Sequence, residues 1–264
     1  MPLEKSEVVI LKSFDWSESS RTVHFFSREF GKLALVDRAG RRLKMKRGRL
    51  LPFSRMEVTF YSSRKGTSGY VSDSEIIELF SFEKDGTLGR LAFASAACEL
   101  LYLLLPDEEP QVALYVYFVS YLRQVTQIEK RYLPAVFVAF LLRLLSQLGY
   151  QPSLAHCAGC GTETGKMTAW EEQIQFSPQR GGLVCRACQK PGEYYIDLSA
   201  EGAELLALLQ RASLNEAASL PIGYQNAMYL IEALTTFLKY HSGMVSDLKS
   251  LTFLEKLKTS ELNG

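Results

Sequence analysis

Two closely spaced pairs of cysteines, Cys157-x-x-Cys160 and Cys185-x-x-Cys188, constrain the fold of this chain more than any other feature. A two-residue spacer lets both thiolates of a pair turn toward one ion, and four thiolates fill the tetrahedral shell of a structural zinc ion at about 2.3 Å. The 24 residues between the pairs suffice for a small ribbon that brings the pairs together. The spacing therefore predicts one structural Zn²⁺ per chain, held by Cys157, Cys160, Cys185 and Cys188.

Three other uses of these cysteines compete with a structural zinc site. Two disulfides need an oxidising compartment, and the N-terminal residues lack the basic stretch and apolar core of a signal sequence. A redox pair needs only one Cys-x-x-Cys at a helix start, and a catalytic zinc needs an open coordination position that four thiolates would fill. His156 is expected to be a bystander, and Cys98 a small buried hydrophobe in an apolar helical run.

The composition is that of a globular protein with an uneven charge distribution. The chain has 264 residues, 47% hydrophobic and 22% charged, which is enough for two modest domains. Its longest apolar runs stop short of the roughly 20 residues that span a bilayer, so we expect buried helices and no membrane association. Residues 1–80 hold 15 Lys and Arg against 10 Asp and Glu, whereas the remainder holds 15 against 19. A polyanion would therefore bind near the N-terminal end.

The first 80 residues predict a small β-barrel. Short β-branched and aromatic runs, separated by turns, indicate five strands at residues 8–14, 21–27, 32–36, 55–61 and 69–78. The commonest closed barrel of this size is the oligonucleotide-binding (OB) fold, although an SH3-like barrel would give a similar pattern. We expect residues 1–80 to form an OB-fold nucleic-acid-binding domain.

Helical periodicity begins near Thr87 and indicates an α-helical domain over residues 81–264, with the zinc ribbon inserted at about 151–195. Helices are expected at 87–105, 111–130, 134–147, 200–211, 224–241 and 246–257. Ser199 is placed as an N-cap, and Ser213-x-x-Glu216 matches a capping box. The predicted class is a multidomain α+β protein, with the barrel followed by the helical domain and its four-cysteine zinc ribbon.

A basic segment follows the third predicted strand and has seven cations in twelve residues. Such a run often forms only a solvated face, but loop glycines and a barrel that can present it favour phosphate binding. Six aromatic residues of the barrel (Phe25, Phe26, Phe53, Phe60, Tyr61 and Tyr70) could stack on bases, although each is expected in the core. The predicted DNA-binding residues are Arg38, Arg41, Arg42, Lys44, Lys46, Arg47 and Arg49.

Several segments together resemble the RecO family of bacterial recombination and repair mediators. The N-terminal strands and the basic segment that runs into Leu50-Leu51-Pro52-Phe53 are similar to the family's opening barrel. The most specific match is Leu148-Gly149-Tyr150 ahead of the first cysteine pair, with Phe176-Ser177-Pro178-x-x-Gly181-Gly182-x-x-Cys185 leading into the second. Near the C-terminus, Tyr240-His241 and Leu248-Lys249-Ser250-x-x-Phe253-Leu254 also match.

The resemblance implies an OB barrel, a helical domain with a zinc ribbon, and no enzyme activity. It implies binding of single- and double-stranded DNA, annealing of complementary strands without ATP, and assistance to RecA loading in RecF-pathway recombination. The implied partners are RecR, the C-terminal tail of the single-stranded-DNA-binding protein and, indirectly, RecA, in the cytoplasm at the nucleoid. Family members often carry basic residues where this chain has Val138 and Ala139, in a region that helps to receive that tail.

Other function classes stay open at this point. The cysteines and charges would also suit a zinc-ribbon protein-interaction adaptor or an RNA-binding barrel protein. A metal-dependent nuclease is the weakest alternative, because the sequence shows no P-loop, no nucleophile with a matched base and no carboxylate cluster for Mg²⁺.

Overall fold

The computed structural model describes residues 2–15, 20–38, 50–62, 69–168, 173–243 and 248–256. The chain divides into two compact units, residues 1–87 with 94–126 and residues 88–93 with 127–264. The predicted boundary near residue 80 coincides with the end of the barrel strands. The first unit continues beyond it into the first two helices.

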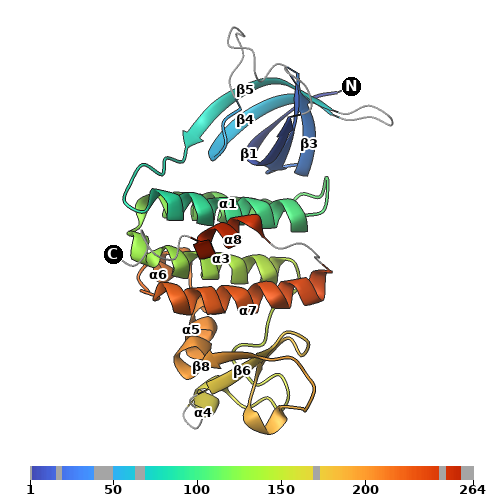
Figure 1. Cartoon of the computed structure of the whole chain (residues 1–264). Helices are drawn as coiled ribbons and strands as arrows, with labels where there is room; N and C mark the ends of the chain where they lie inside the picture. Colours follow the sequence, from blue (N-terminus) through green and yellow to red (C-terminus); the bar gives the residue numbers. More distant parts are fainter. Residues whose placement is uncertain are drawn as a thin grey trace. The chain divides into compact units, whose positions relative to one another are not determined.

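The first unit contains a closed five-stranded barrel. Its strands are β1 (Leu3–Asp15), β2 (Arg21–Ser27), β3 (Gly31–Asp37), β4 (Ser54–Tyr61) and β5 (Tyr70–Leu79), in the order β1-β2-β3-β5-β4 (Figure 1). β1 also pairs with β4, and β3 meets β5 in parallel at Val36 and Tyr70, which closes the barrel. This strand order confirms the predicted OB fold.

Alternation along the strands fills the barrel interior. In β4, buried residues alternate strictly with partly exposed ones, as expected for a strand with one face in the core. The barrel core contains Val8, Ile10, Val23, Phe25, Leu33, Leu35, Leu50, Met56, Val58, Phe60 and Val71. Phe26 is also buried, against Tyr115 and Phe118 of the second helix. Phe25, Phe26 and Phe60 are therefore core residues, as predicted.

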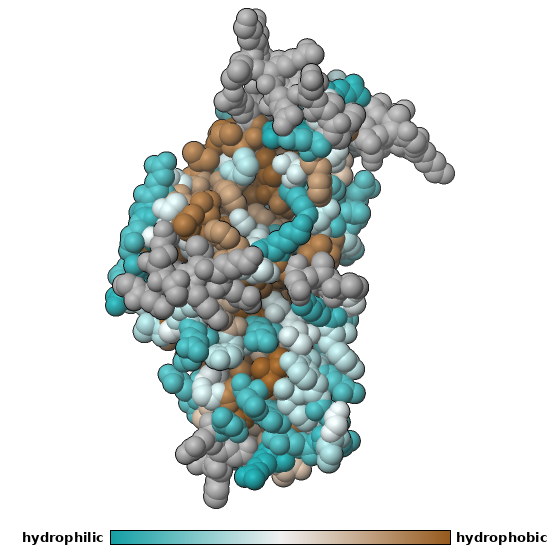
Figure 2. Space-filling model, in the orientation of Figure 1, coloured by the Kyte–Doolittle hydropathy of each residue, from teal (hydrophilic) through white to brown (hydrophobic). Residues whose placement is uncertain are grey.

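Strand β5 ends in three exposed apolar residues. Ile76, Ile77 and Leu79 are 41%, 43% and 58% exposed. Figure 2 shows hydrophobic atoms gathered on this part of the barrel. Exposed apolar residues that gather on one part of a surface favour contact with another macromolecule.

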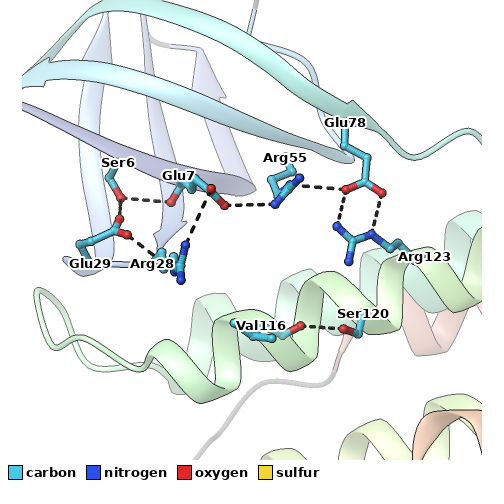
Figure 3. Close-up of polar contacts among 9 residues, drawn as sticks. All are labelled: Ser6, Glu7, Arg28, Glu29, Arg55, Glu78, Val116, Ser120 and Arg123. Atoms are coloured by element: carbon cyan, nitrogen blue, oxygen red, sulfur yellow. Dashed lines mark hydrogen bonds and ion pairs between the residues drawn. The ribbon is translucent and has the colours of Figure 1, made fainter.

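A chain of ion pairs fastens the barrel to the second helix of the same unit. Glu7 contacts Arg28 at 3.8 Å and Arg55 at 3.3 Å, and Arg55 continues to Glu78 at 3.4 Å. Arg123 donates two hydrogen bonds of 2.7 Å to Glu78, which lowers the pKa of that carboxyl group (Figure 3). These barrel arginines are therefore neutralised within the protein.

The helices follow the predicted pattern closely. They are α1 (Thr87–Leu104), α2 (Val112–Gln127), the short η1 (Lys130–Tyr132), α3 (Leu133–Gln147), α5 (Ala200–Arg211), α6 (Leu214–Ala217), α7 (Tyr224–Ser242) and α8 (Lys249–Lys256). In the second unit, α3 is buried over most of its length and contacts α5, α6 and α7. It is the central helix of that unit.

Two predicted helix caps are confirmed. Ser199 accepts a hydrogen bond of 3.0 Å from the backbone N–H of Gly202 at the start of α5. Ser213 and Glu216 form both bonds of a capping box at the start of α6. These local signals located both helix starts correctly.

The predicted extension of α2 to Lys130 was wrong. Glu129 has an extended backbone that leads into η1. The carbonyl of Ile128 accepts a 2.7 Å hydrogen bond from the buried Arg90 side chain instead of continuing a helical ladder. Because this partner lies far away in the sequence, periodicity alone does not reveal the end of α2.

Helix α1 is long and apolar enough, by length and composition alone, to cross a membrane. However, 56% of its 18-residue window is buried inside the protein, and Phe93, Ala94 and Leu100 are fully buried. A core helix passes the same test, so the composition of α1 is weak support for a membrane span.

Gly31 provides a test of how the turn between α1 and α2 packs against β3. Its φ is +69°, and a Cβ there would lie 2.1 Å from the carbonyl oxygen of Glu109. Gly149 has a φ of +82° with nothing within 4 Å of such a Cβ, so it is a matched control. We expect Gly149→Ala to lower the free energy of unfolding by about 1 kcal/mol and Gly31→Ala by on the order of 3 kcal/mol, measured by urea denaturation. Equal losses of unfolding free energy in the two variants would mean that the turn at Glu109 moves to accommodate the added Cβ without cost.

Candidate metal centre and nucleic-acid interface

The ribbon of the second unit brings the two cysteine pairs together. Its elements are α4 (Thr164–Thr168), β6 (Gln173–Ser177), β7 (Gly182–Val184), η2 (Arg186–Cys188) and β8 (Ile196–Ser199), with the sheet order β7-β6-β8. Ala158 donates a 2.7 Å backbone hydrogen bond to Leu183 in β7, directly before the second pair. Gly182 is required because a Cβ there would lie 2.2 Å from the carbonyl oxygen of Ser153.

The four predicted ligands converge. The sulfur atoms of Cys157, Cys160, Cys185 and Cys188 all lie within 4.8 Å of one another, and the sulfurs of Cys160 and Cys185 are 3.7 Å apart. Tetrahedral ligands at about 2.3 Å from one ion would be roughly 3.8 Å apart. The cluster could therefore hold a metal ion. His156 does not belong to it, as predicted.

All five cysteines, each of which lies in the described part of the chain, are free thiols. The two-disulfide alternative is therefore not realised. Cys98 is buried in α1, and burial raises the pKa of its thiol to about 12. It is the inert small hydrophobe that the sequence predicts.

Hydrogen bonds around the cluster favour thiolates at the first pair. Burial raises the pKa of Cys157, but backbone N–H groups, including those of Cys185 and Gly159 at 3.3 Å, outweigh burial and the pKa is lowered. Hydrogen bonding by Thr162 lowers the pKa of Cys160 to about 6. Hydrogen bonding with the Cys160 and Cys185 thiols raises the pKa of Cys188 to about 12. Without a cation the cluster ionises only in part, so this donor set fits a divalent metal ion.

Arg180 fixes the loop that carries the fourth ligand. It forms a two-fold ion pair with Glu193, at 2.8 and 3.0 Å, and donates a 2.7 Å hydrogen bond to the backbone carbonyl of Cys188. Tyr195 donates its hydroxyl to Glu193 at 2.7 Å. Arg180 therefore holds the loop that carries Cys188.

Of the seven predicted DNA-binding cations, Arg38 lies within the described residues. Arg41, Arg42, Lys44, Lys46, Arg47 and Arg49 lie outside them. The two ends of the segment are held by one side chain, because Arg21 pairs with Asp37 at 3.1 Å and donates to the carbonyl of Leu50 at 3.2 Å. Asp37 is only 1% exposed. Asp37, the carboxylate nearest in sequence to the basic segment, is therefore buried and paired with Arg21.

Arg38 lies over an aromatic pair. Its guanidinium carbon is 4.4 Å from the ring centroid of Tyr70, and the Tyr70 ring stacks on Tyr61 with centroids 4.8 Å apart. Both tyrosines are only partly buried. The expectation that every barrel aromatic is a core residue was therefore wrong for Tyr61 and Tyr70. Phe53 is also partly exposed and packs against Phe82.

The residues of α3 that differ from the family pattern lie in the protein interior. Val138, Ala139 and Phe140 are 0%, 2% and 0% exposed. These side chains therefore offer no surface to another protein. Nearby, Arg131 pairs with Glu129 at 3.0 Å and lies over the ring of Tyr132.

Comparison with known proteins identifies the family. Residues 1–80 match the family model described as Recombination protein O N terminal, and residues 86–252 match Recombination protein O C terminal. The DNA repair protein RecO of Symbiobacterium thermophilum is 29% identical over 261 residues, covering 98% of this chain and 100% of that protein. Its counterpart from Listeria monocytogenes is 27% identical over 97% and 95% of the two chains. The one from Anaeromyxobacter dehalogenans is 32% identical over 89% and 90%. The chain therefore belongs to the RecO family of DNA repair and recombination proteins.

Proposed function

We propose that this protein is a recombination mediator that binds single- and double-stranded DNA and anneals complementary strands without ATP. The observation that carries the proposal is the basic segment between β3 and β4 of an OB barrel, with both ends held by Arg21 and the nearest carboxylate buried. Cations in such a position neutralise phosphates and release counterions, which gives affinity with little sequence preference. The relatives named above are DNA repair proteins, which favours DNA over RNA as the ligand.

The protein acts as a platform rather than as a catalyst. Two strands repel each other through their phosphates, and a cationic surface that contacts both lowers this repulsion. Base pairing then supplies the specificity. In this scheme Arg38, Arg41, Arg42, Lys44, Lys46, Arg47 and Arg49 contact phosphates, and no residue takes part in a covalent step.

The metal is proposed to be zinc with a structural role. Cys157, Cys160, Cys185 and Cys188 would hold it, and four thiolates leave no open position for substrate. Bound zinc would supply the positive charge that lets all four thiols ionise. The ribbon is short, with a β7 of three residues, so metal binding would contribute much of its folding energy.

The proposed protein partners are RecR, the single-stranded-DNA-binding protein and, indirectly, RecA, in the cytoplasm at the nucleoid. Because Val138 and Ala139 are buried, the acidic tail of the single-stranded-DNA-binding protein would dock elsewhere than on these side chains. The exposed apolar residues at the end of β5 offer one surface for protein contact.

Removal of the basic segment tests DNA binding. We expect replacement of Arg41, Arg42, Lys44, Lys46, Arg47 and Arg49 with alanine to weaken binding to all DNA sequences at low salt. If about five cations engage a single strand, the log-log salt slope of the unmodified protein should be roughly −3.5, and that of the variant should be shallower. Lys166→Ala, which removes an exposed cation paired with Glu163, is the control.

Unchanged affinity at low salt, measured by fluorescence anisotropy, would contradict the proposal and favour a protein-interaction adaptor. Tighter binding to a matched RNA strand would favour the RNA alternative.

Strand annealing tests the platform role. We expect the protein to accelerate annealing of complementary oligonucleotides without ATP, and the basic-segment variant to lose most of this acceleration because phosphate repulsion is restored. Fluorescence energy transfer between labelled strands measures the rate. Strands coated with the single-stranded-DNA-binding protein, with or without its C-terminal tail, test the partner in the same assay. Binding without any acceleration would reject the annealing role.

Gly159 tests the metal centre. A Cβ at this position would lie 2.9 Å from the sulfur of Cys188, whereas one at Gly165 would meet nothing within 4 Å. We expect Gly159→Ala to release zinc to a chelator faster than Gly165→Ala, because the fourth ligand is displaced. Zinc content and release are measured by mass spectrometry and a colorimetric chelator, with Cys185→Ser as the fully disrupted reference. Purified protein without stoichiometric metal would refute the zinc assignment.

A further inference from the structure

The strand register of the barrel aligns five outward-facing residues across four strand pairings. Phe14 of β1 pairs with Thr22, Thr22 with Val36, Val36 with Tyr70, and Tyr70 with Tyr61. Residues paired across strands share one face of a sheet. We call Phe14, Thr22, Val36, Tyr70 and Tyr61 the outer row.

The outer row faces away from the barrel core. Its members are partly or largely exposed, and Phe14 is 42% exposed. Their immediate neighbours Val23, Leu35, Phe60 and Val71 are almost fully buried, as strand alternation requires. The row therefore forms a belt on the outside of the barrel, with aromatic rings toward both ends.

The unpaired cations of the described barrel lie on this same belt. Among the described residues up to the end of β5, five Lys and Arg side chains contact carboxylates: Lys5, Arg21, Arg28, Lys32 and Arg55. In this part of the chain, Lys12 and Arg38 have no carboxylate partner. The ammonium of Lys12 lies 4.9 Å from the ring centroid of Phe14, and the guanidinium of Arg38 lies 4.4 Å from that of Tyr70. Each aromatic end of the row thus has its own uncompensated cation.

The Phe14 ring is held in place before any ligand arrives. His24 contacts it edge-on, with centroids 5.7 Å apart, and Tyr102 of α1 lies 6.2 Å away. Burial, together with the charges of Lys32 and Lys12, lowers the pKa of His24, so that its ring is neutral near pH 7. An exposed aromatic ring that is fixed by its neighbours binds a flat partner at a low cost in side-chain entropy.

We propose that the outer row is a base-stacking track for single-stranded DNA, with unpaired bases lying on Phe14 and on the stack formed by Tyr61, Tyr70 and the Arg38 guanidinium, and with phosphates near Lys12. Three strand spacings of about 4.8 Å separate Phe14 from Tyr70, or roughly 14 Å along the surface. Bases between these two rings would pass over Thr22 and Val36. The track rests on the proposed DNA binding and adds strand selectivity to it, because the faces of bases are accessible only in unpaired strands.

Single substitutions on the row distinguish stacking from phosphate attraction. In the full-length protein we expect Phe14→Ala and Tyr70→Ala each to weaken binding of a labelled single strand about tenfold, with less than a twofold effect on the matched duplex at the same salt concentration. Phe14→Leu keeps apolar packing against Tyr102 and His24, and it should show the same selective loss if the fold is intact. Tyr229→Ala removes a ring of α7 that is 50% exposed, compared with 42% for Phe14, and is the control.

An oligonucleotide with abasic positions makes the test independent of folding. The unmodified protein should bind the abasic strand about tenfold more weakly than the normal strand, whereas Phe14→Ala should show a smaller difference between the two. Equal losses for single strand and duplex, or an unchanged preference for normal over abasic strands, would overturn the stacking track. If the unmodified protein bound neither the single strand nor the duplex, the proposed DNA binding itself would be rejected, which is a different outcome from loss of stacking alone.

Discussion

The parallel pairing of β3 with β5 is the contact on which the arrangement of the barrel surface depends. The backbone N–H of Val36 donates a 2.9 Å hydrogen bond to Gly69, and this short pairing closes the sheet between Val36 and Tyr70. Closure brings Tyr70 beside the start of the basic segment, where Arg38 covers its ring. Barrel closure also aligns the outer row, because the register of each strand pair determines which residues lie side by side. Without the β3–β5 pairing, the barrel would keep the same cations, but they would no longer be aligned with the aromatic residues of the outer row.

The four-cysteine cluster lies in a ribbon with a small apolar core. The three short strands bury Ile174, Phe176, Leu183, Val184, Ile196 and Leu198. This is little apolar area for a ribbon of this length, and small units of this kind commonly depend on a bound metal. The Arg180–Glu193 pair and the backbone N–H groups that face Cys157 orient the ligands but do not supply the charge that four thiolates need. In the proposed function, a bound metal ion would supply that charge.

The features that sequence reasoning located correctly depend on short-range rules. The caps at Ser199 and Ser213 are set within three residues, and the two-residue spacing within each cysteine pair brings its two sulfur atoms together. The strands of the barrel were also predicted, because alternation marks one buried face. The features that escaped prediction depend on contacts between distant residues. Arg90 ends α2 through Ile128, and Arg21 holds both ends of the basic segment.

The outer row escaped prediction for a related reason. Phe14 and Tyr70 are more than fifty residues apart, and alternation within each strand shows only that both can face outward. Their alignment appears only when three strand registers are known, one of them parallel.

The pairing of charges also depends on contacts between distant residues. Composition counts 15 cations in the first 80 residues, but only the ion-pair partners reveal that Arg28 and Arg55 are neutralised while Lys12 and Arg38 are not.

The magnitudes of the two proposed binding modes fit a protein that must release its ligand. Aromatic stacking contributes about 1–3 kcal/mol per base, so a track with two aromatic ends holds a single strand by roughly 2–6 kcal/mol beyond phosphate attraction. Each step of a new duplex gains about 1.4 kcal/mol, and ten steps therefore exceed the stacking term. Pairing would draw bases away from the two aromatic ends of the row, while the phosphate contacts proposed for the basic segment, which do not depend on pairing, would persist. A longer aromatic track would hold the bases too tightly for them to move into a duplex. A barrel without such a track would bind single strands and duplexes alike.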